Sequence, residues 1–315
     1  MTFLITGGAG FIGSNLVEQL LRRGERVRVF DNFSTGFRKN IEQWQSSIEI
    51  VEGDIREYDV VLKAMQGVDC VLHQAALPSV PRSIQDPIAS NASNVTGTLN
   101  VLQAVREAGV KRAVFASSSS VYGDTPVLPK QEDMPANPLS PYAVSKLAGE
   151  SYFSVFGRVY GIQTVALRYF NVFGPRQNPD SQYSAVIPKF IKAMMAGKRP
   201  VIYGDGTQSR DFTFVANVVE ANIRAATRDI PPGSVMNCAC HGQVTLNELV
   251  ARLNAILGTN IEPEYAEPRQ GDIKHSFADI DRMKRLLDFT PSVDFETGLK
   301  RTCDYYRTHP VVPLL

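Results

Sequence analysis

Residues 6–13 of the chain read Thr6-Gly7-Gly8-Ala9-Gly10-Phe11-Ile12-Gly13, which spaces glycines as in G-x-x-G-x-x-G. This stretch follows the short apolar run 3–5 and precedes a segment, 11–23, with apolar residues at helical spacing. Glycine permits a tight turn and lets the backbone approach a pyrophosphate closely. The free N–H groups at the start of a helix attract an anion. The stretch therefore predicts a strand, a turn and a helix that bind a dinucleotide.

An acidic residue follows the second predicted strand, 27–30. Asp31 stands near the distance from the glycines at which an acid binds the adenosine ribose of a dinucleotide. A carboxylate there would repel a 2′-phosphate, which favours NAD over NADP, although three basic residues lie nearby, at Arg28, Arg38 and Lys39. Asp54-Ile55, after the third strand, is predicted to reach the adenine; the alternative is that Asp54 caps the next helix.

Short apolar runs alternate with amphipathic segments through the first half of the chain. We predict strands at 3–5, 27–30, 48–51, 70–73, 113–116 and 164–167, and helices at 11–23, 91–108 and 142–160. Strands this apolar are typical of a parallel sheet covered on both faces. Right-handed crossovers then give an α/β fold with a doubly wound parallel (Rossmann) sheet.

The second half has a looser pattern. Helical segments are predicted near 186–195, 215–226, 245–257 and 295–306, between loops rich in Gly, Pro and Asp. The loops include Gly204-Asp205-Gly206, which we expect to be a hairpin turn. We therefore assign 1–170 to a NAD-binding Rossmann domain, with some later segments returning to it. Residues 171–315 form mainly a smaller C-terminal α/β substrate-binding domain.

Composition narrows the possible functions. The chain has 315 residues, 43% hydrophobic and 21% charged, with a formal net charge of +1, so no broad electrostatic footprint for nucleic acid or an acidic membrane follows. Four cysteines and four histidines show no metal-site spacing. No signal peptide precedes the first strand, and no apolar run approaches the ~18 residues of a membrane span. A cytoplasmic protein is expected.

A tyrosine and a lysine occur four residues apart in the third predicted helix. Tyr142 and Lys146 share a helix face at this spacing. A neighbouring ammonium and a positively charged nicotinamide would lower the pKa of the phenol and make it a usable base near neutral pH. A tyrosine and a lysine at this spacing on a helix are more often exposed surface residues without a catalytic role. Here the pair follows a dinucleotide-binding turn and a strand that ends in Ser117-Ser118-Ser119-Ser120, which favours the catalytic interpretation.

Over nearly its full length the chain resembles the extended short-chain dehydrogenase/reductase family. The resemblance rests on Gly7, Gly10, Gly13, Asp31, His73-Gln74-Ala75-Ala76, Asn94, Ser118, Tyr142, Lys146 and Arg168-Tyr169-Phe170-Asn171. It implies that Tyr142 is the catalytic base, that Lys146 binds the nicotinamide ribose, and that Ser118 bonds the reacting sugar hydroxyl. The implied NAD contacts are Gly7, Gly10, Phe11, Ile12, Gly13, Asp31, Asn32, Asp54, Ile55, Gln74, Ala75, Ala76, Asn94, Tyr142, Lys146 and Tyr169.

The residues after the serine separate the reactions of this family. Sugar 4,6-dehydratases have Thr-Asp-Glu there, and nucleotide-glucuronate decarboxylases usually keep a glutamate at position 120, whereas this chain has Ser118-Ser119-Ser120. The resemblance therefore favours an NAD-dependent 4-epimerase that oxidises the sugar at C4, lets the 4-ketosugar rotate, and returns the hydride. A dehydratase, decarboxylase or reductase of the same family is the alternative. A non-catalytic NAD sensor is disfavoured by the retained catalytic trio.

The resemblance also implies contacts for a UDP-sugar substrate. Arg210 and Arg269 match positions that clamp the diphosphate, although either arginine could form a surface ion pair instead. Asp272 matches a ribose ligand, and Asn171 a residue that contacts the diphosphate-sugar. Val186 and Tyr203 are expected to enclose the uracil. The full predicted set is Ser79, Ser118, Ser119, Asn171, Gln177, Val186, Tyr203, Arg210, Arg269, Asp272 and Ser276.

Sugar preference is predicted from one wall of the pocket. The chain is most similar to bacterial UDP-N-acetylglucosamine 4-epimerases, in which a small residue at the Ser276 position admits an N-acetyl group, and Gln177 matches a residue of the same pocket. Pro78 replaces the glycine expected near the N-acetyl side. UDP-glucose 4-epimerases resemble the chain almost as closely, and UDP-glucuronate 4-epimerases stay an alternative. The helices at 91–108 and 142–160 match the pair that forms a homodimer interface in this family, although their apolar residues could be ordinary core.

Overall fold

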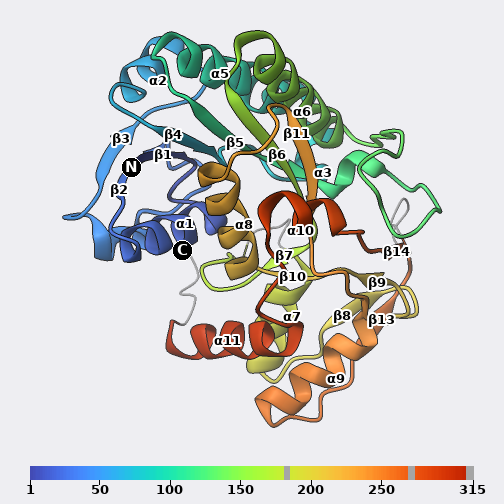
Figure 1. The fold of residues 1–315 in the computed structure, drawn as a ribbon. Coiled ribbons are helices and arrows are strands. Elements are labelled where there is room, and N and C mark those ends of the chain that lie inside the picture. The colour runs from blue at the N-terminus through green and yellow to red at the C-terminus, as the bar shows by residue number, and fades with distance from the viewer. Residues whose placement is uncertain (181–184, 269–273, 310–315) are drawn as a thin grey trace.

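The computed structural model describes residues 1–180, 185–268 and 274–309, and its centre is a seven-stranded sheet (Figure 1). The strand order is β11-β6-β5-β4-β1-β2-β3, and every neighbouring pair is parallel. The strands are β1 (Thr2–Thr6), β2 (Arg26–Asp31), β3 (Glu49–Glu52), β4 (Cys70–His73), β5 (Arg112–Ser118), β6 (Gln163–Tyr169) and β11 (Ser234–Cys238). The predicted α/β class and parallel Rossmann sheet are confirmed.

Helices cover both faces of this sheet (Figure 1). On one face lie α1 (Phe11–Arg22) and α8 (Val215–Thr227); on the other lie α2 (Tyr58–Ala64), α5 (Gly97–Glu107) and α6 (Pro141–Tyr160). Consecutive residues of β1 alternate between the two cores: Phe3 and Ile5 join the α1 side, and Leu4 joins the α5 side. No helix within the described ranges is long and apolar enough to cross a membrane.

The edge strand β11 comes from the second half of the chain. It pairs with β6 from Ser234↔Val165 to Cys238↔Tyr169, so a late segment does return to the Rossmann sheet. The sequence analysis did not identify this strand, because its apolar run is only Val235-Met236 before the polar Asn237. The domain boundary at residue 170 stays a prediction.

The helix predicted at 91–108 is three consecutive pieces rather than one regular helix. After α3 (Val80–Gln85), the chain forms α4 (Pro87–Asn91), a π-helical turn (Ala92–Thr96) and then α5. A π-helical turn inserts an extra residue and is common at functional sites. Here it contains the buried Asn94, one of the predicted NAD contacts.

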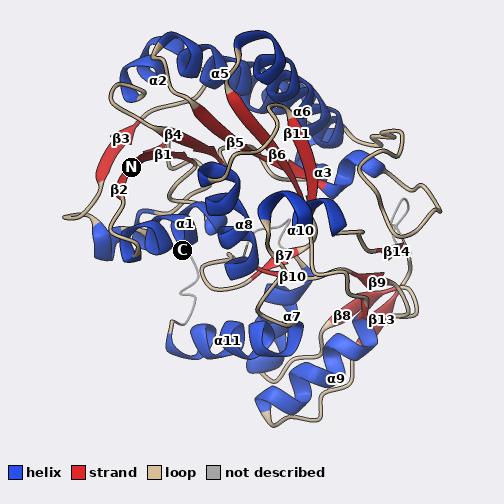
Figure 2. Cartoon of the chain, in the orientation of Figure 1, coloured by secondary structure: helices blue, strands red, loops and turns tan. Residues whose placement is uncertain are grey.

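Short strands and helices make up most of the second half outside α8 and β11 (Figure 2). The strands are β7 (Val172–Phe173) with β10 (Thr213–Phe214), β8 (Val201–Tyr203) with β13 (Glu264–Ala266), and β9 (Ser209–Arg210) between β12 (Val244–Thr245) and β14 (His275–Ser276). The helices are α7 (Val186–Met195), α9 (Leu246–Leu257), α10 (Asp281–Leu287) and α11 (Phe295–Thr308). Their buried residues, such as Phe190 and Leu249, belong to the same core as Ile5.

The hairpin expected at Gly204-Asp205-Gly206 is wrong. The strand before it, β8, pairs with β13, whereas the strand after it, β9, pairs with β12 and β14. The Asp205 carboxylate accepts the Thr207 N–H at 2.9 Å, and the Asn247 side chain donates to the Asp205 carbonyl at 3.1 Å. These bonds direct the chain from one small sheet into another instead of back along β8.

Candidate active site

The glycine turn between β1 and α1 has the geometry of an anion site. Gly7 has φ +70°, and a Cβ there would lie 2.8 Å from the Ala75 backbone. A Cβ on Gly13 would collide with the Gly7 carbonyl oxygen. Gly10 caps α1 without a side-chain hydrogen bond, and the first turn of α1 contains no acidic residue. The N–H groups at this helix end are therefore available for a pyrophosphate.

Asp31 is buried beside this turn, with an exposed fraction of 7%. Its carboxylate accepts the Ala9 N–H at 2.9 Å and the Phe33 N–H at 2.8 Å. Burial raises the pKa of Asp31, while the two backbone hydrogen bonds oppose that shift. Asp31 therefore helps to fix the turn itself, and its contact with a ribose stays a prediction.

Two of the three basic residues near Asp31, Arg28 and Arg38, are paired with β3. Arg28 Nε lies 2.6 Å from Glu49, and Arg38 forms an ion pair with Glu52. Both guanidinium groups thus have carboxylate partners, which reduces their attraction for a 2′-phosphate. This pairing agrees with the predicted preference for NAD.

Two of the residues predicted near the adenine contact each other. The Asn32 amide donates to Asp54 at 2.8 Å, and Arg56 donates to the same carboxylate at 2.7 Å. Hydrogen bonds from Arg56 are the largest cause that lowers the pKa of Asp54, to about 2. The alternative that Asp54 caps the next helix is wrong, because α2 has Glu57 at its N-cap.

Asn94, one of the predicted cofactor contacts, hydrogen-bonds the loop that follows β4. Its side-chain oxygen accepts the Leu77 N–H at 2.7 Å, and its amide donates to Ser145 Oγ at 3.0 Å. The loop that carries Gln74, Ala75 and Ala76 is thereby joined to α6, which carries Tyr142 and Lys146.

A buried asparagine that the sequence analysis missed joins two more predicted contacts. Asn222, on α8, donates to the Tyr169 hydroxyl at 2.8 Å and accepts from the Gln74 amide at 3.1 Å. The Tyr169 hydroxyl lies 3.2 Å from the Gln74 oxygen and closes a triangle. Asn222 is 148 positions after Gln74, so no local motif links them. The available signal was a polar residue on the apolar face of a predicted helix.

His73 is a structural histidine. Its Nδ1 lies 2.6 Å from Thr6 Oγ1, its Nε2 lies 2.9 Å from Thr98 Oγ1, and its ring is fully buried. Burial, with a smaller contribution from the Lys146 charge, lowers the pKa of His73 to about 3. A neutral His73 therefore ties β1, β4 and α5 together beneath the site.

Ser118, Tyr142 and Lys146 come together as predicted. Ser118 ends β5, and its side chain lies close enough to the Tyr142 phenol, at the start of α6, to act on the pKa of that group. Lys146, one helical turn later, donates to the Ala116 carbonyl at 2.8 Å, and its Nζ lies 5.8 Å from the centre of the Tyr142 ring. The N-cap Ser140 accepts the Ala143 N–H and fixes where this helix begins.

The chain by itself does not produce the lowered tyrosine pKa that the sequence predicts. Burial raises the pKa of Tyr142, and the hydrogen bond from Ser118 only opposes that shift. Burial also lowers the pKa of Lys146 to about 7, so its ammonium is easily lost near neutral pH. A phenolate here needs further positive charge, and the predicted contribution of the nicotinamide stays a prediction.

A buried ion pair fixes α6 against the sheet. Arg168 on β6 and Glu150 on α6 are both 5% exposed, with Arg168 Nε 3.0 Å from Glu150 Oε2. Ser117, the chain neighbour of Ser118, donates to the same carboxylate at 2.9 Å. The sequence analysis did not single out Glu150, although it lies one helical turn after Lys146.

Four of the predicted nucleotide contacts line one cleft of about 270 Å³ between α7, β8 and β9. The cleft includes Asn171, Val186, Tyr203 and Arg210, together with apolar side chains such as Phe212. This combination of an apolar slot and a guanidinium suits a base attached to phosphates.

The structure describes some of the remaining predicted substrate contacts and leaves others outside the described residues. Ser276 lies beside Arg210 across the β9–β14 pair, and its side chain is half-buried. Ser79 caps α3 by accepting the Arg82 N–H at 3.1 Å. Ser119 begins the 3₁₀ turn directly after Ser118. Arg269 and Asp272 lie outside the described residues, so their contacts stay predictions.

Gln177 supplies a buried acceptor without a partner. Its amide donates to the Val172 carbonyl at 3.1 Å, whereas its Oε1 is buried and has no hydrogen-bond partner among the described residues. A buried unsatisfied acceptor costs stability unless a ligand or water satisfies it. This arrangement agrees with the predicted place of Gln177 in a sugar pocket.

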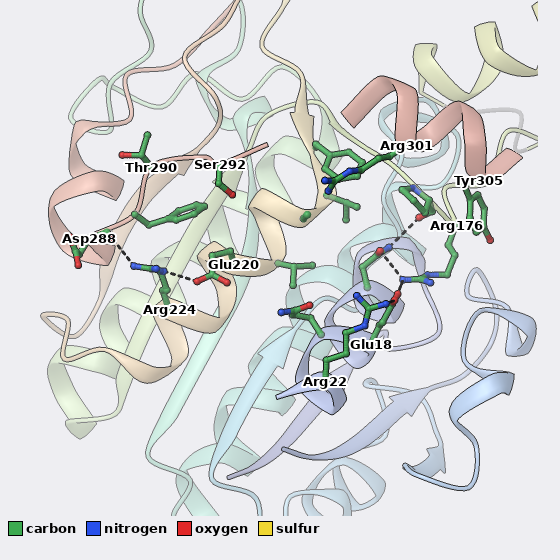
Figure 3. A pocket seen from close by; sticks show the side chains of 18 residues that line it. Glu18, Arg22, Arg176, Glu220, Arg224, Asp288, Thr290, Ser292, Arg301 and Tyr305 are labelled. Atoms are coloured by element: carbon green, nitrogen blue, oxygen red, sulfur yellow. Dashed lines mark hydrogen bonds and ion pairs between the residues drawn. The ribbon is translucent and has the colours of Figure 1, made fainter. Parts of the chain in front are cut away.

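The larger cavity, about 740 Å³, lies elsewhere, between α1, α8 and α11 (Figure 3). None of the predicted site residues lines it. Its arginines are largely paired: Arg176 lies 2.6 Å from Glu18, and Arg224 lies 2.7 Å from Glu220. Arg176 also donates to Ser14 on α1 at 3.1 Å. These contacts join the loop that carries Gln177 to the helix that follows the glycine turn.

Comparison with known proteins agrees with this geometry. The NAD dependent epimerase/dehydratase family matches residues 3–239. A UDP-glucose 4-epimerase of Mycolicibacterium smegmatis is 38% identical over 98% of this chain and 99% of its own length. A UDP-N-acetylglucosamine 4-epimerase of Methanobrevibacter ruminantium, solved with UDP-N-acetylmuramic acid, has a TM-score of 0.94 at 40% identity and covers 98% of both chains. A UDP-glucose 4-epimerase of Thermus thermophilus, solved with NAD, has a TM-score of 0.89 at 36% identity, with 98% of this chain and 99% of that chain covered.

Proposed function

The chain belongs to the NAD-dependent epimerase/dehydratase family, and on that premise we propose that it is an NAD-dependent 4-epimerase of UDP-sugars. The observation that carries the proposal is the grouping of Ser118, Tyr142 and Lys146 at a strand end that is followed by two serines instead of acids. The relatives with this activity extend over nearly the whole chain.

The residues of the chain suit oxidation and re-reduction of one sugar carbon. Bound NAD supplies a hydride acceptor for the first half of the reaction and a hydride donor for the second. Tyr142 takes the proton of the sugar 4-hydroxyl as the C4–H hydride leaves, and gives that proton back when hydride returns to the opposite face. Ser118 bonds both the Tyr142 hydroxyl and the reacting oxygen. Lys146 binds the nicotinamide ribose.

The residues after Ser118 argue against elimination. Loss of a hydroxyl group requires an acid that can protonate it, and Ser119 and Ser120 supply no carboxyl group for that role. Ser120 Oγ is buried and has no partner among the described residues, so it offers a neutral hydrogen bond rather than a proton source. A dehydratase or decarboxylase reaction is therefore the weaker proposal.

For the sugar, we favour an N-acetylated hexose, with UDP-glucose and UDP-galactose as further substrates. Ser276 is small, and the unpartnered Gln177 Oε1 can accept a hydrogen bond from an N–H or O–H of the sugar. The similarity to the Methanobrevibacter enzyme supports this choice. Pro78 in place of the expected glycine is the observation that keeps plain hexoses, and UDP-glucuronate, as alternatives.

The test is to incubate the purified protein separately with UDP-GlcNAc, UDP-glucose and UDP-glucuronate, without added NAD. The expected product is UDP-GalNAc, detected by chromatography and NMR, because NAD is regenerated in each cycle and stays bound. Tyr142→Phe is expected to abolish turnover while the NAD content is unchanged, and Tyr160→Phe, on the same helix, is the control. A 4-keto or decarboxylated product would contradict the proposal.

We further propose a homodimer formed through α5 and α6. Three valines on the outer side of α6 are exposed: Val144 by 52%, Val155 by 51% and Val159 by 65%. An exposed apolar stripe on a long helix fits a protein interface. Light scattering is expected to give twice the chain mass, and Val155→Lys to give a monomer, with Val127→Lys as the control. A monomeric wild type at micromolar concentration would reject the homodimer.

A further inference from the structure

A single buried carboxylate holds the substrate side of the site together. Asp211, directly after β9, has an exposed fraction of 0%. Its Oδ1 accepts the Cys240 N–H at 3.0 Å, and its Oδ2 accepts the Ala278 N–H at 3.2 Å. Each carboxylate oxygen therefore bonds a different segment: the loop after β11 and the stretch after β14.

The backbone of the same residue reaches two predicted substrate contacts. Its N–H donates to the Ser276 carbonyl at 2.8 Å, and its carbonyl accepts from the Asn171 side chain at 3.3 Å. Arg210, the predicted diphosphate clamp, is its chain neighbour. Through Asp211, four segments far apart in the sequence meet at one point.

An amide cannot replace this carboxylate. Both side-chain oxygens accept hydrogen bonds from backbone N–H groups. In Asp211→Asn, one oxygen becomes an NH₂ group, which is a donor and cannot accept the hydrogen bond of the backbone N–H opposite it. The displaced N–H would be left buried without a partner, which costs more than the hydrogen bond gains. The strand pair that carries Arg210 and Ser276 must then shift.

We propose that Asp211 is a positioning residue that sets Arg210, Ser276 and Asn171 in register for the nucleotide-sugar. It does not touch the reacting atoms, and it lies apart from the glycine turn, Tyr142 and Lys146. The inference rests on the proposed function, because it assigns the register to a UDP-sugar. It predicts that Asp211 controls substrate binding separately from cofactor binding and from the chemical step.

The experiment compares wild type, Asp211→Asn and the control Asp205→Asn. Asp205 is exposed in the same region, and asparagine can keep its turn with Thr207, so the control removes the same charge without the buried contacts. Binding of UDP is measured by titration calorimetry, the NAD content by absorbance after denaturation, and KM and kcat with the substrate identified above.

For Asp211→Asn we expect the UDP Kd and the KM to rise about ten-fold, which corresponds to one lost buried hydrogen bond of charged type. NAD content and kcat at saturation are expected to stay near wild type, and Asp205→Asn is expected to bind UDP normally. If Asp211→Asn does not fold, Asp211→Glu is tested. It keeps both acceptors but is one methylene longer, and a weaker UDP affinity is again expected.

Unchanged UDP binding in the Asp211 variant would overturn the inference. Equal losses of UDP affinity, NAD content and kcat would also overturn it, because they would indicate a general structural role. A wild-type protein that does not bind UDP would overturn the proposed function and, with it, this inference. The wild-type measurement therefore separates the two failures.

Discussion

The two halves of the site are positioned in different ways. On the cofactor side, Gly7, Asp31 and Ser118 follow or end strands of one parallel sheet, so the sheet itself sets their spacing. On the substrate side, Arg210 and Ser276 lie on strands of two residues. The Asp211 N–H donates to the Ser276 carbonyl, and the Asp211 carboxylate accepts backbone N–H groups of the two segments that flank these strands. The buried sheet sets the geometry of the cofactor side. The substrate side depends on a few polar contacts, each of which a single substitution can remove.

The largest effect should come from breaking the ion pair that joins α6 to the sheet on the cofactor side. Arg168→Met leaves the Glu150 carboxylate buried without its partner, so we expect the free energy of unfolding to fall by about 3–5 kcal/mol. Urea denaturation measures this change. Arg252→Met, which removes the exposed pair with Glu296, should cost about 0–1 kcal/mol. Similar costs for both variants would show that the sheet does not need the buried pair.

A smaller effect is expected when alanine replaces a glycine in the turn after β1, compared with alanine at a left-handed glycine elsewhere. Gly7 and Gly24 both have positive φ, +70° and +74°, but only at Gly7 would a Cβ meet other backbone atoms. Gly24→Ala should lower the free energy of unfolding by about 1–2 kcal/mol and keep NAD. Gly7→Ala should also lose NAD, measured in the purified protein by absorbance. Retention of NAD by Gly7→Ala would contradict the proposed place of the cofactor.

The smallest effect should be an opposite pH response of one carboxylate in each half. The pKa of Asp54 is lowered to about 2 by Arg56, so its stabilisation is complete above the ordinary value of 3.8 and is lost as pH falls toward 2. Burial raises the pKa of Asp211 to about 6. The contribution of Asp211 to the free energy of unfolding is complete below pH 3.8 and is lost as pH rises through 6.

Thermal unfolding between about pH 2 and pH 7 measures both responses. The difference in Tm between wild type and Asp54→Asn should grow as pH rises from about 2 to 3.8 and stay constant above that. The difference between wild type and Asp211→Asn should shrink as pH rises through about 6. The charge of His241 opposes the rise in the pKa of Asp211, so His241→Gln is the control. Parallel pH trends for the two aspartates would contradict the assigned pKa shifts.

The sequence predicts most of what is local. The glycine turn, the Tyr142–Lys146 pair and six of the strands of the sheet follow from spacing within one short segment. The contacts that hold the site do not: Asn222 is 148 positions from Gln74, and Asp211 is 67 positions from Ala278. No periodic pattern marks a polar residue whose partner is so distant.

On the substrate side, too, the sequence predicts the binding residues but not the residue that positions them. Family resemblance selected Asn171, Val186, Tyr203 and Arg210, and the structure places all four in one cleft. It did not select Asp211, which has no part in a recognisable binding motif and acts through backbone N–H groups. The π-helical turn at Asn94 was missed for a related reason, because one extra residue in a helix leaves its apolar spacing almost unchanged.

The origin of β11 limits how this chain can be divided. A fragment that ends near residue 170 contains every predicted contact to the dinucleotide, yet it leaves β6, which is buried on both faces, as an open edge. Such a fragment should aggregate instead of serving as an independent module. Chimaeras that exchange the substrate side between relatives therefore need to retain 234–238 from the parent that supplies the sheet, so the exchange requires more than one crossover point.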